Sequence, residues 1–334
     1  MGSIIMPGFS FASNLSEDAG ERSGFALSEV DILNHLQDQS PVRKAIEQPN
    51  SLHRIRADAY AEAVANLLYF LGATEEPSMP TLGSRFARSL GHEWKNIVNI
   101  EELLTIEAVA HHVLRKRQET GDLDRALLVN ELKDIVGSRW RKIHEQLLES
   151  MSMELAFSPW YSRSVNTNNL IELANLFKSE ALPVDSNTFV DQRFINYLSK
   201  HLDLLGSINW RQFEGLTAEW LSRQNYRIEL GKGRNDGGID VRAWRTDAPP
   251  HSPPAILVQC KREQRKIGKV IVKALWADVF HEQAKSGLIV TTNDISPGAE
   301  KVVNARTYPI TTANRKQVGD WIMAMRKPAA GIIL

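Results

Sequence analysis

The chain has 334 residues, of which 43% are hydrophobic and 24% charged, with 40 Lys and Arg balanced by 40 Asp and Glu. This composition excludes a disordered chain, a collagen-like fibre and a disulfide scaffold, and the length predicts about two domains. The charges are unevenly spread, because residues 205–334 hold 20 basic and 12 acidic side chains, while residues 1–204 hold the remaining 20 and 28. A basic half is typical of a protein that binds a polyanion.

The N-terminal part shows helical patterning and little strand character. Residues 1–25 are rich in Gly and Ser, and we expect a flexible leader there. Residues 26–188 are predicted to form an all-helical domain, whose role the sequence does not indicate. Its predicted elements are a helix capped by Ser28 and Asp31, an apolar helix over 59–71, a Pro- and Gly-containing loop over 77–91, and helices over 101–117 and 123–151.

Residues 189–334 change character and predict an α/β domain. The predicted helices cover 190–205, 211–224, 269–284, 296–306 and 315–325, and the predicted strands cover 226–230, 238–244, 255–261, 287–292 and 308–312. From the helix at 211–224 onward the order is helix, three strands, helix, strand, helix, strand, helix. This order predicts a mixed central sheet flanked by helices.

Two of the predicted strands carry polar residues that a purely structural strand would not need. Side chains alternate along a strand, so in AILVQCK the side chains of Gln259 and Lys261 share one face. In GGIDVRA, Asp240 and Arg242 share one face. If the two strands are neighbours, Asp240, Gln259 and Lys261 converge, and Glu214 lies on the preceding helix at the edge of its apolar stripe.

These residue types suit metal-assisted hydrolysis of a phosphodiester bond. Mg²⁺ prefers oxygen ligands, and we expect Asp240 to supply a carboxylate, Gln259 an amide oxygen and Cys260 its backbone carbonyl. Lys261 would stabilise developing negative charge or position the attacking water. Because Gln259 carries no charge, the site should bind metal more weakly than a site with two acids. Mn²⁺ is expected to substitute for Mg²⁺.

Four segments in this order resemble the Mrr-type restriction endonuclease domain of the PD-(D/E)xK nuclease superfamily, in its QxK variant. They are RQFEGLTAEWLSRQNYRIE, NDGGIDVRAW, ILVQCKRE and GLIVTTNDISPGAEKVV. The resemblance implies a restriction-endonuclease-like fold for residues 189–334, with Asp240, Gln259 and Lys261 as the metal-binding and catalytic core. Glu214 is then the helical acid, which assists Asp240 in catalysis and in metal binding. It also implies a Mg²⁺-dependent DNA endonuclease that acts in restriction or antiviral defence against foreign or modified DNA.

The expected partner is double-stranded DNA. The segment KREQRKIGKVIVK contains six Lys and Arg, and we predict phosphate contacts from Arg262, Arg265, Lys266 and Lys269. One active site cuts one strand, so we expect a homodimer or a higher oligomer. The N-terminal helical region is the candidate site for an activating ligand or a partner protein.

Two alternatives stay open. The first is a non-catalytic nucleic-acid-binding or regulatory protein on a nuclease fold, against which the complete set of Asp240, Gln259 and Lys261 argues. The second is a nuclease for another substrate, either a branched-DNA resolvase or an RNA nuclease. The single cysteine cannot form an internal disulfide bond, which favours a cytoplasmic location. No apolar run approaches the roughly 18 residues that span a bilayer, so no membrane partner is expected.

Overall fold

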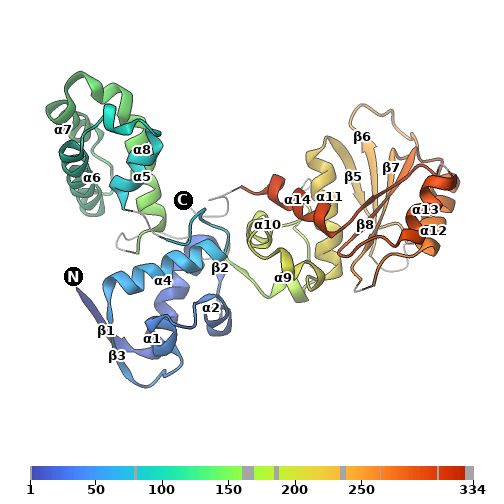
Figure 1. Cartoon of the computed structure of the whole chain (residues 1–334), viewed down its shortest axis with the longest axis horizontal. Coiled ribbons are helices and arrows are strands. Elements are labelled where there is room, and N and C mark those ends of the chain that lie inside the picture. The colour runs from blue at the N-terminus through green and yellow to red at the C-terminus, as the bar shows by residue number, and fades with distance from the viewer. Residues whose placement is uncertain are drawn as a thin grey trace. The chain divides into compact units, whose positions relative to one another are not determined.

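The computed structural model divides into two compact units (Figure 1). It describes residues 2–78, 81–159, 169–183, 188–233, 238–263, 265–306 and 308–327. Of the described residues, the N-terminal unit holds those of Met1–Phe70 and Thr74–Leu170, and the C-terminal unit holds Leu71–Ala73 and those of Ile171–Gly331. The C-terminal unit therefore begins before the predicted boundary at residue 189. Leu176 explains the difference, because it is fully buried and its carbonyl accepts a hydrogen bond from Asn209 N at 2.9 Å.

The N-terminal unit is mostly helical. Its helices are α1 (Gly8–Leu15), α2 (Glu29–His35), α3 (Pro41–Ile46), α4 (Ala57–Phe70), α5 (Leu82–Ser89), α6 (Ile100–Thr120), α7 (Arg125–Val136) and α8 (Trp140–Phe157). The capping box of Ser28 and Asp31 at α2 is confirmed. The prediction of an all-helical domain is wrong in one place, because β1 (Ser3–Pro7) pairs with β3 (Leu52–Arg56) in an antiparallel ribbon. A two-residue strand, β2 (Phe25–Ala26), follows a π-helical turn at Ser16–Glu21.

The first 25 residues do not form a flexible leader. They contain β1, α1 and the π-helical turn, and the side chains of Phe11, Leu15 and Phe25 are fully buried. Phe11 and Leu15 are four residues apart, so they lie on the same face of α1 and anchor it. The Gly and Ser content predicts a flexible segment, whereas the burial of these large apolar side chains keeps it ordered.

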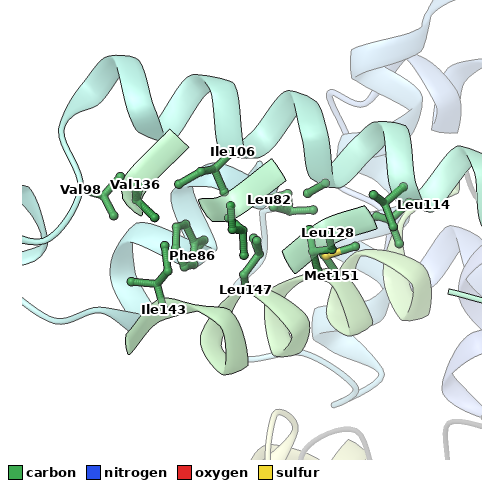
Figure 2. Packing of buried hydrophobic residues seen from close by; sticks show 13 residues of the cluster. Leu82, Phe86, Val98, Ile106, Leu114, Leu128, Val136, Ile143, Leu147 and Met151 are labelled. Carbon is green, nitrogen blue, oxygen red and sulfur yellow. The ribbon is translucent and has the colours of Figure 1, made fainter. Parts of the chain in front are cut away.

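Helices α5 to α8 enclose one hydrophobic core (Figure 2). Phe86 of α5 is fully buried in it, together with Ile106 of α6 and Leu147 of α8. The predicted loop over 77–91 is wrong from Leu82 onward, because the Thr81 hydroxyl accepts a hydrogen bond from Ser84 N and starts α5. Core packing thus outweighs the local Pro and Gly content.

We predict that Phe86→Ala lowers the free energy of unfolding by about 3–5 kcal/mol, because it leaves a cavity in the core of α5 to α8. Urea denaturation followed by circular dichroism measures the change. The control is Leu104→Ala on α6, whose side chain is 61% exposed and whose loss should cost less than about 0.5 kcal/mol. Equal effects of the two substitutions would contradict the prediction.

The C-terminal unit is an α/β domain, as predicted. Its elements are β4 (Ile171–Glu172), α9 (Asn175–Lys178), α10 (Gln192–Leu198), α11 (Trp210–Arg223), β5 (Tyr226–Leu230), β6 (Val241–Arg245), β7 (Ile256–Lys261), α12 (Lys269–His281), β8 (Ser286–Thr291), α13 (Pro297–Arg306), β9 (Ile310–Ala313) and α14 (Arg315–Met325), with a 3-10 turn at Leu202–Gly206. The sheet order is β5-β6-β7-β8-β9. Pairs β5–β6 and β6–β7 are antiparallel, and pairs β7–β8 and β8–β9 are parallel. The mixed sheet is therefore confirmed.

Helices cover both faces of this sheet (Figure 1). On one face, Leu257 of β7 packs with Leu275 of α12 and Ala299 of α13 in a buried cluster. On the other face lie α11 and α14, whose Trp220 and Trp321 rings stack with centroids 5.2 Å apart. Among the described residues, no helix is both long and apolar enough to span a bilayer.

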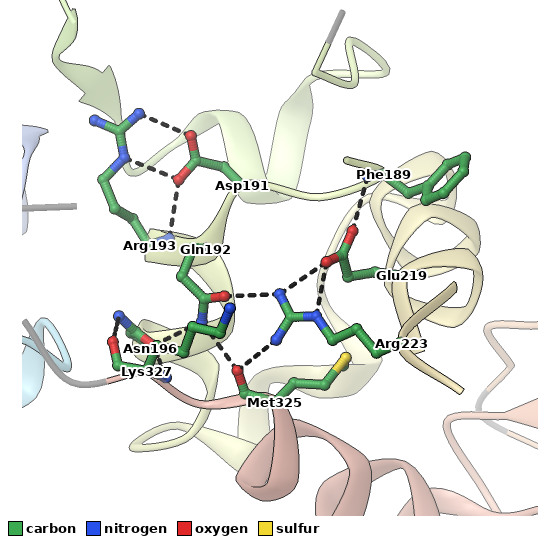
Figure 3. Close-up of polar contacts among 9 residues, drawn as sticks. All are labelled: Phe189, Asp191, Gln192, Arg193, Asn196, Glu219, Arg223, Met325 and Lys327. Carbon is green, nitrogen blue, oxygen red and sulfur yellow. Dashed lines mark hydrogen bonds and ion pairs between the residues drawn. The ribbon is translucent and has the colours of Figure 1, made fainter. Parts of the chain in front are cut away.

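A polar network ties distant segments of the C-terminal unit together (Figure 3). Arg223 at the end of α11 bonds to Glu219, to Gln192 of α10 and to the Met325 carbonyl that ends α14. Glu219, 6% exposed, also accepts a hydrogen bond from Phe189 N at 2.9 Å. The network fixes α11, and with it the position of Glu214 on the same helix, against both the start and the end of the domain.

Candidate active site

The site lies where β6 and β7 separate. The amide of Asp240 donates to the Val258 carbonyl at 2.9 Å, while Val241 is the ladder partner of the same Val258. Two residues that oppose one residue form a β-bulge, which re-aims a side chain at the start of a strand. The prediction that Asp240 and Arg242 share one face of the sheet is wrong. Arg242 pairs with Glu282 at 2.6 Å, just after the end of α12, whereas Asp240 contacts Glu214 of α11 on the other side. The preceding residues 234–237 lie outside the described residues.

The bulge points the Asp240 carboxylate into the space between the two strands. Its Oδ2 accepts a hydrogen bond from Cys260 N at 2.6 Å. The N–H and C=O of a strand residue point to the same side, so the Cys260 carbonyl also faces this space. Asp240 itself is only 7% exposed. A carboxylate and a backbone carbonyl thus occupy one edge of β7.

Glu214 of α11 joins Asp240 in this buried space. Its side chain is 7% exposed, and the pKa of Glu214 is raised to about 7, chiefly by burial. The Asp240 carboxylate, with which it hydrogen-bonds, also contributes to this rise, and the guanidinium of Arg211, 2.7 Å away, opposes both effects. The structure therefore brings together two carboxyl groups that repel each other when both are charged.

Gln259 adds an oxygen atom without a partner. The side chain is buried, and its Oε1 has no hydrogen-bond partner among the described residues. The amide group of Gln259 packs closely against the backbone of Gly238, where a Cβ atom would lie 3.3 Å from Gln259 Nε2. Gly238 also has a positive φ of +88°, so glycine suits both the backbone conformation and this close contact. An unpaired buried amide oxygen costs about 1–3 kcal/mol, so this oxygen is available to a hydrogen-bond donor or a cation.

Lys261 is half-buried at the last position of β7, and its ammonium has no ion-pair partner among the described residues. Cys260 between these residues turns its side chain to the α11 face, where Sγ lies 3.5 Å from Thr217 Oγ1. Burial first, and then the Asp240 charge, raises the pKa of the Cys260 thiol well above its ordinary value. The thiol is therefore neutral, and only the backbone of Cys260 serves the site.

The basic segment after β7 is exposed but not uniformly free. Arg262 donates to the Ile208 carbonyl at 2.7 Å, which holds its guanidinium against the domain. Lys266 lies 4.0 Å from Asp294 in an exposed ion pair. Arg265 and Lys269 are exposed, and Lys269 begins α12.

Sequence reasoning missed Arg211. This arginine is three residues before Glu214 on α11, a spacing that brings two helical side chains together. The motif predicts the acid but not the arginine. The spacing of Arg211 and Glu214 was the available signal.

Comparison with known proteins supports the fold. Residues 205–322 match a family model described as restriction endonuclease. This part of the chain is a restriction endonuclease domain. It contains Glu214, Asp240, Gln259, Cys260 and Lys261.

Two relatives resemble parts of the chain. An uncharacterized protein of Sinorhizobium fredii, y4cE, is 22% identical over 136 residues, which are 40% of this chain and 35% of that protein. The solved structure of the MspJI restriction endonuclease in complex with a 27-mer oligonucleotide is 19% identical, with a TM-score of 0.27. That match covers 55% of this chain and 40% of the solved one. The chain therefore spans well under two thirds of either relative.

The raised pKa of Glu214 predicts a pH dependence of stability in metal-free protein. The folded endonuclease domain binds the proton more tightly than the unfolded chain, whose Glu pKa is near 4.5. The stability from protonated Glu214 is thus fully present below about pH 4.5 and is lost as pH rises through about 7. Glu214→Gln imitates the protonated form, so the variant should match the wild type at about pH 4.5. At about pH 8 it should be more stable by about 1–3 kcal/mol.

Urea denaturation in EDTA, followed by tryptophan fluorescence at both pH values, measures this difference. The control is Glu229→Gln in β5, where the side chain is exposed. A Glu214→Gln effect that is identical at both pH values would contradict the assignment.

Proposed function

We propose that this chain is a Mg²⁺-dependent endonuclease that hydrolyses phosphodiester bonds of double-stranded DNA. One observation carries the proposal: the endonuclease domain buries the carboxyl groups of Glu214 and Asp240 together, and the adjacent strand β7 holds the buried, unpartnered amide oxygen of Gln259. Such an arrangement costs stability, and a bound cation would offset the cost.

The donor atoms fit a hard divalent cation. Asp240 and Glu214 supply carboxylate oxygens, Gln259 supplies Oε1, and Cys260 supplies its backbone carbonyl. Among the described residues, no three His, Cys, Asp or Glu side chains gather, so the set depends on the amide and the carbonyl. Two acids rather than three predict modest affinity, with Mn²⁺ as a substitute. A cation held there supplies Lewis-acid activation of water and neutralises charge at the scissile phosphate.

The residues of the chain divide the remaining work. The Cys260 N–H and the bulge fix the Asp240 carboxylate in position before substrate arrives. Arg211 orients Glu214, whose pKa near neutrality lets its carboxyl group give up a proton when a cation approaches. Lys261 has no competing carboxylate partner, so its ammonium can orient the attacking water or stabilise the charge that develops on the phosphate.

The DNA backbone is the expected contact of the basic segment. Arg265 and Lys269 are exposed, and Lys266 has only a long ion pair to break. Arg262 can contact a phosphate through the guanidinium N–H groups that are not bonded to the Ile208 carbonyl. Each chain holds one site, so we expect two chains for cleavage of both strands. Cleavage of foreign or modified DNA, as in restriction and antiviral defence in the cytoplasm, is the role that fits this chemistry.

We predict that Lys261→Ala lowers kcat for plasmid nicking in Mg²⁺ by roughly 100- to 1,000-fold, because charge on the phosphate is then no longer stabilised. Gel electrophoresis of supercoiled plasmid measures the rate. The control is Lys285→Ala, an exposed lysine just before β8, at the end of the sheet away from Lys261. EDTA should stop cleavage by the wild type.

The outcomes separate the alternatives. Binding of DNA without cleavage at any concentration of Mg²⁺ or Mn²⁺ would favour a non-catalytic binding protein. Faster cleavage of four-way junctions or of RNA than of linear duplex would favour the other substrates. Equal rates for wild type and Lys261→Ala would remove the lysine from the mechanism.

A further prediction concerns the phosphate contacts. Arg265→Ala combined with Lys269→Ala should reduce the slope of log K against log salt by about 1.8, since each lost contact removes about 0.9. Fluorescence anisotropy of a labelled duplex in EDTA measures the slope. An unchanged slope would show that the DNA follows another path across the domain.

A further inference from the structure

The ribbon formed by β1 and β3 shows one face to solvent. Opposite residues in an antiparallel pair point to the same face, and the pairs on the outer face are Ser3 with Arg56, Ile5 with Arg54 and Pro7 with Leu52. The inner face packs on the unit through Ile55, which is 4% exposed. The ribbon therefore packs on the unit by its inner face, while its outer face is exposed.

Large apolar side chains are exposed on and beside this face. Leu52 is 71% exposed, Ile5 58%, and Phe9, at the start of α1 just after β1, 56%. Arg54, the cross-strand neighbour of Ile5, is exposed and has no hydrogen-bond or ion-pair partner among the described residues. Exposed apolar residues gathered around a charge without a partner are typical of a binding surface.

Charge favours DNA as the occupant. Residues 1–204 carry 28 acidic and 20 basic side chains, so this part of the chain in general repels a polyanion. The outer face of the ribbon has two arginines and no acid among its six residues. Arg56 is held by Asp58 in an exposed ion pair, which a phosphate can replace at little cost.

Shape favours the same partner. The major groove of B-DNA admits a two-stranded antiparallel ribbon, whose face then reads the base edges. Five residues in each strand span about 17 Å, enough to follow the groove over several base pairs. An arginine pairs with guanine O6 and N7, and aliphatic side chains contact the methyl group of thymine.

We propose that the outer face of the β1–β3 ribbon binds duplex DNA in the major groove, with Arg54 on guanine and Ile5 and Leu52 on thymine methyl groups. The N-terminal unit thereby selects the sequences on which the endonuclease domain acts, and this second step rests on the proposed function. The DNA contact itself does not depend on cleavage.

The test uses the full chain in EDTA, so that no cleavage occurs, and a pool of random-sequence duplexes of about 30 base pairs. We expect Arg54→Glu to weaken binding at least about tenfold, because a base contact is lost and a phosphate is repelled. Repeated selection from the pool should enrich a guanine-containing sequence with the wild type and none with the variant. Methylation of guanine N7, which lies in the major groove, should block wild-type binding to the enriched sequence. The matched control is Arg125→Glu, an exposed arginine at the start of α7 in the same unit.

The outcomes are separable from those of the cleavage experiment. If the wild type cuts DNA but Arg54→Glu keeps its affinity and enriches the same sequence, the ribbon proposal is overturned and the proposed function stands. If Arg54→Glu enriches no sequence, whereas the wild type does, and neither protein cuts DNA, the ribbon proposal is supported and the proposed function is not. Leu52→Asp tests a protein partner: dissociation of an oligomer in sedimentation, with DNA selection unchanged, would make the ribbon a protein interface and overturn the proposal.

Discussion

The candidate active site depends on two carboxyl groups that the fold forces together. Glu214 and Asp240 come from a helix and from the start of a strand, and neither is more than 7% exposed. Like charges at short range in a poorly solvated space cannot both be ionised without cost, and the raised pKa of Glu214 expresses that cost. The surroundings partly offset it through Arg211 and the Cys260 N–H. The proposed cation would complete the compensation.

The rest of the C-terminal unit supports this pair. The bulge between β6 and β7 sets the direction of Asp240, and the antiparallel pairing ends at the bulge, where Cys260 N bonds to the carboxylate instead of to another backbone group. Glu214 is placed by α11, whose far end is fixed by Arg223. Local strand geometry therefore positions Asp240, and long-range side-chain hydrogen bonds position Glu214 next to it.

Much of this architecture follows from sequence, because alternation in strands and periodicity in helices are local properties. The order of elements after residue 189 and the capping box at Ser28 were predictable for that reason. The motif also predicts Glu214 and Asp240 as residues of the site. The direction of Asp240 was not predictable from alternation, since a bulge depends on how two strands pair across a long loop. The helix α5 and the ordered first 25 residues were missed because distant packing around Phe86 and Phe11, rather than local composition, stabilises them.

The network around Arg223 has a consequence for the timing of folding. Arg223 and Gln192 both bond to the Met325 carbonyl, which lies 102 positions after Arg223 and 133 positions after Gln192 in the chain. Contacts between such distant positions form late, because the entropy of closing the intervening loop must be met first. During synthesis on a ribosome, α10 and α11 emerge long before Met325 does. Until the end of α14 is in place, α10 and α11 lack the bonds that Gln192 and Arg223 make to the Met325 carbonyl, although α11 can already pack on β5, β6 and β7.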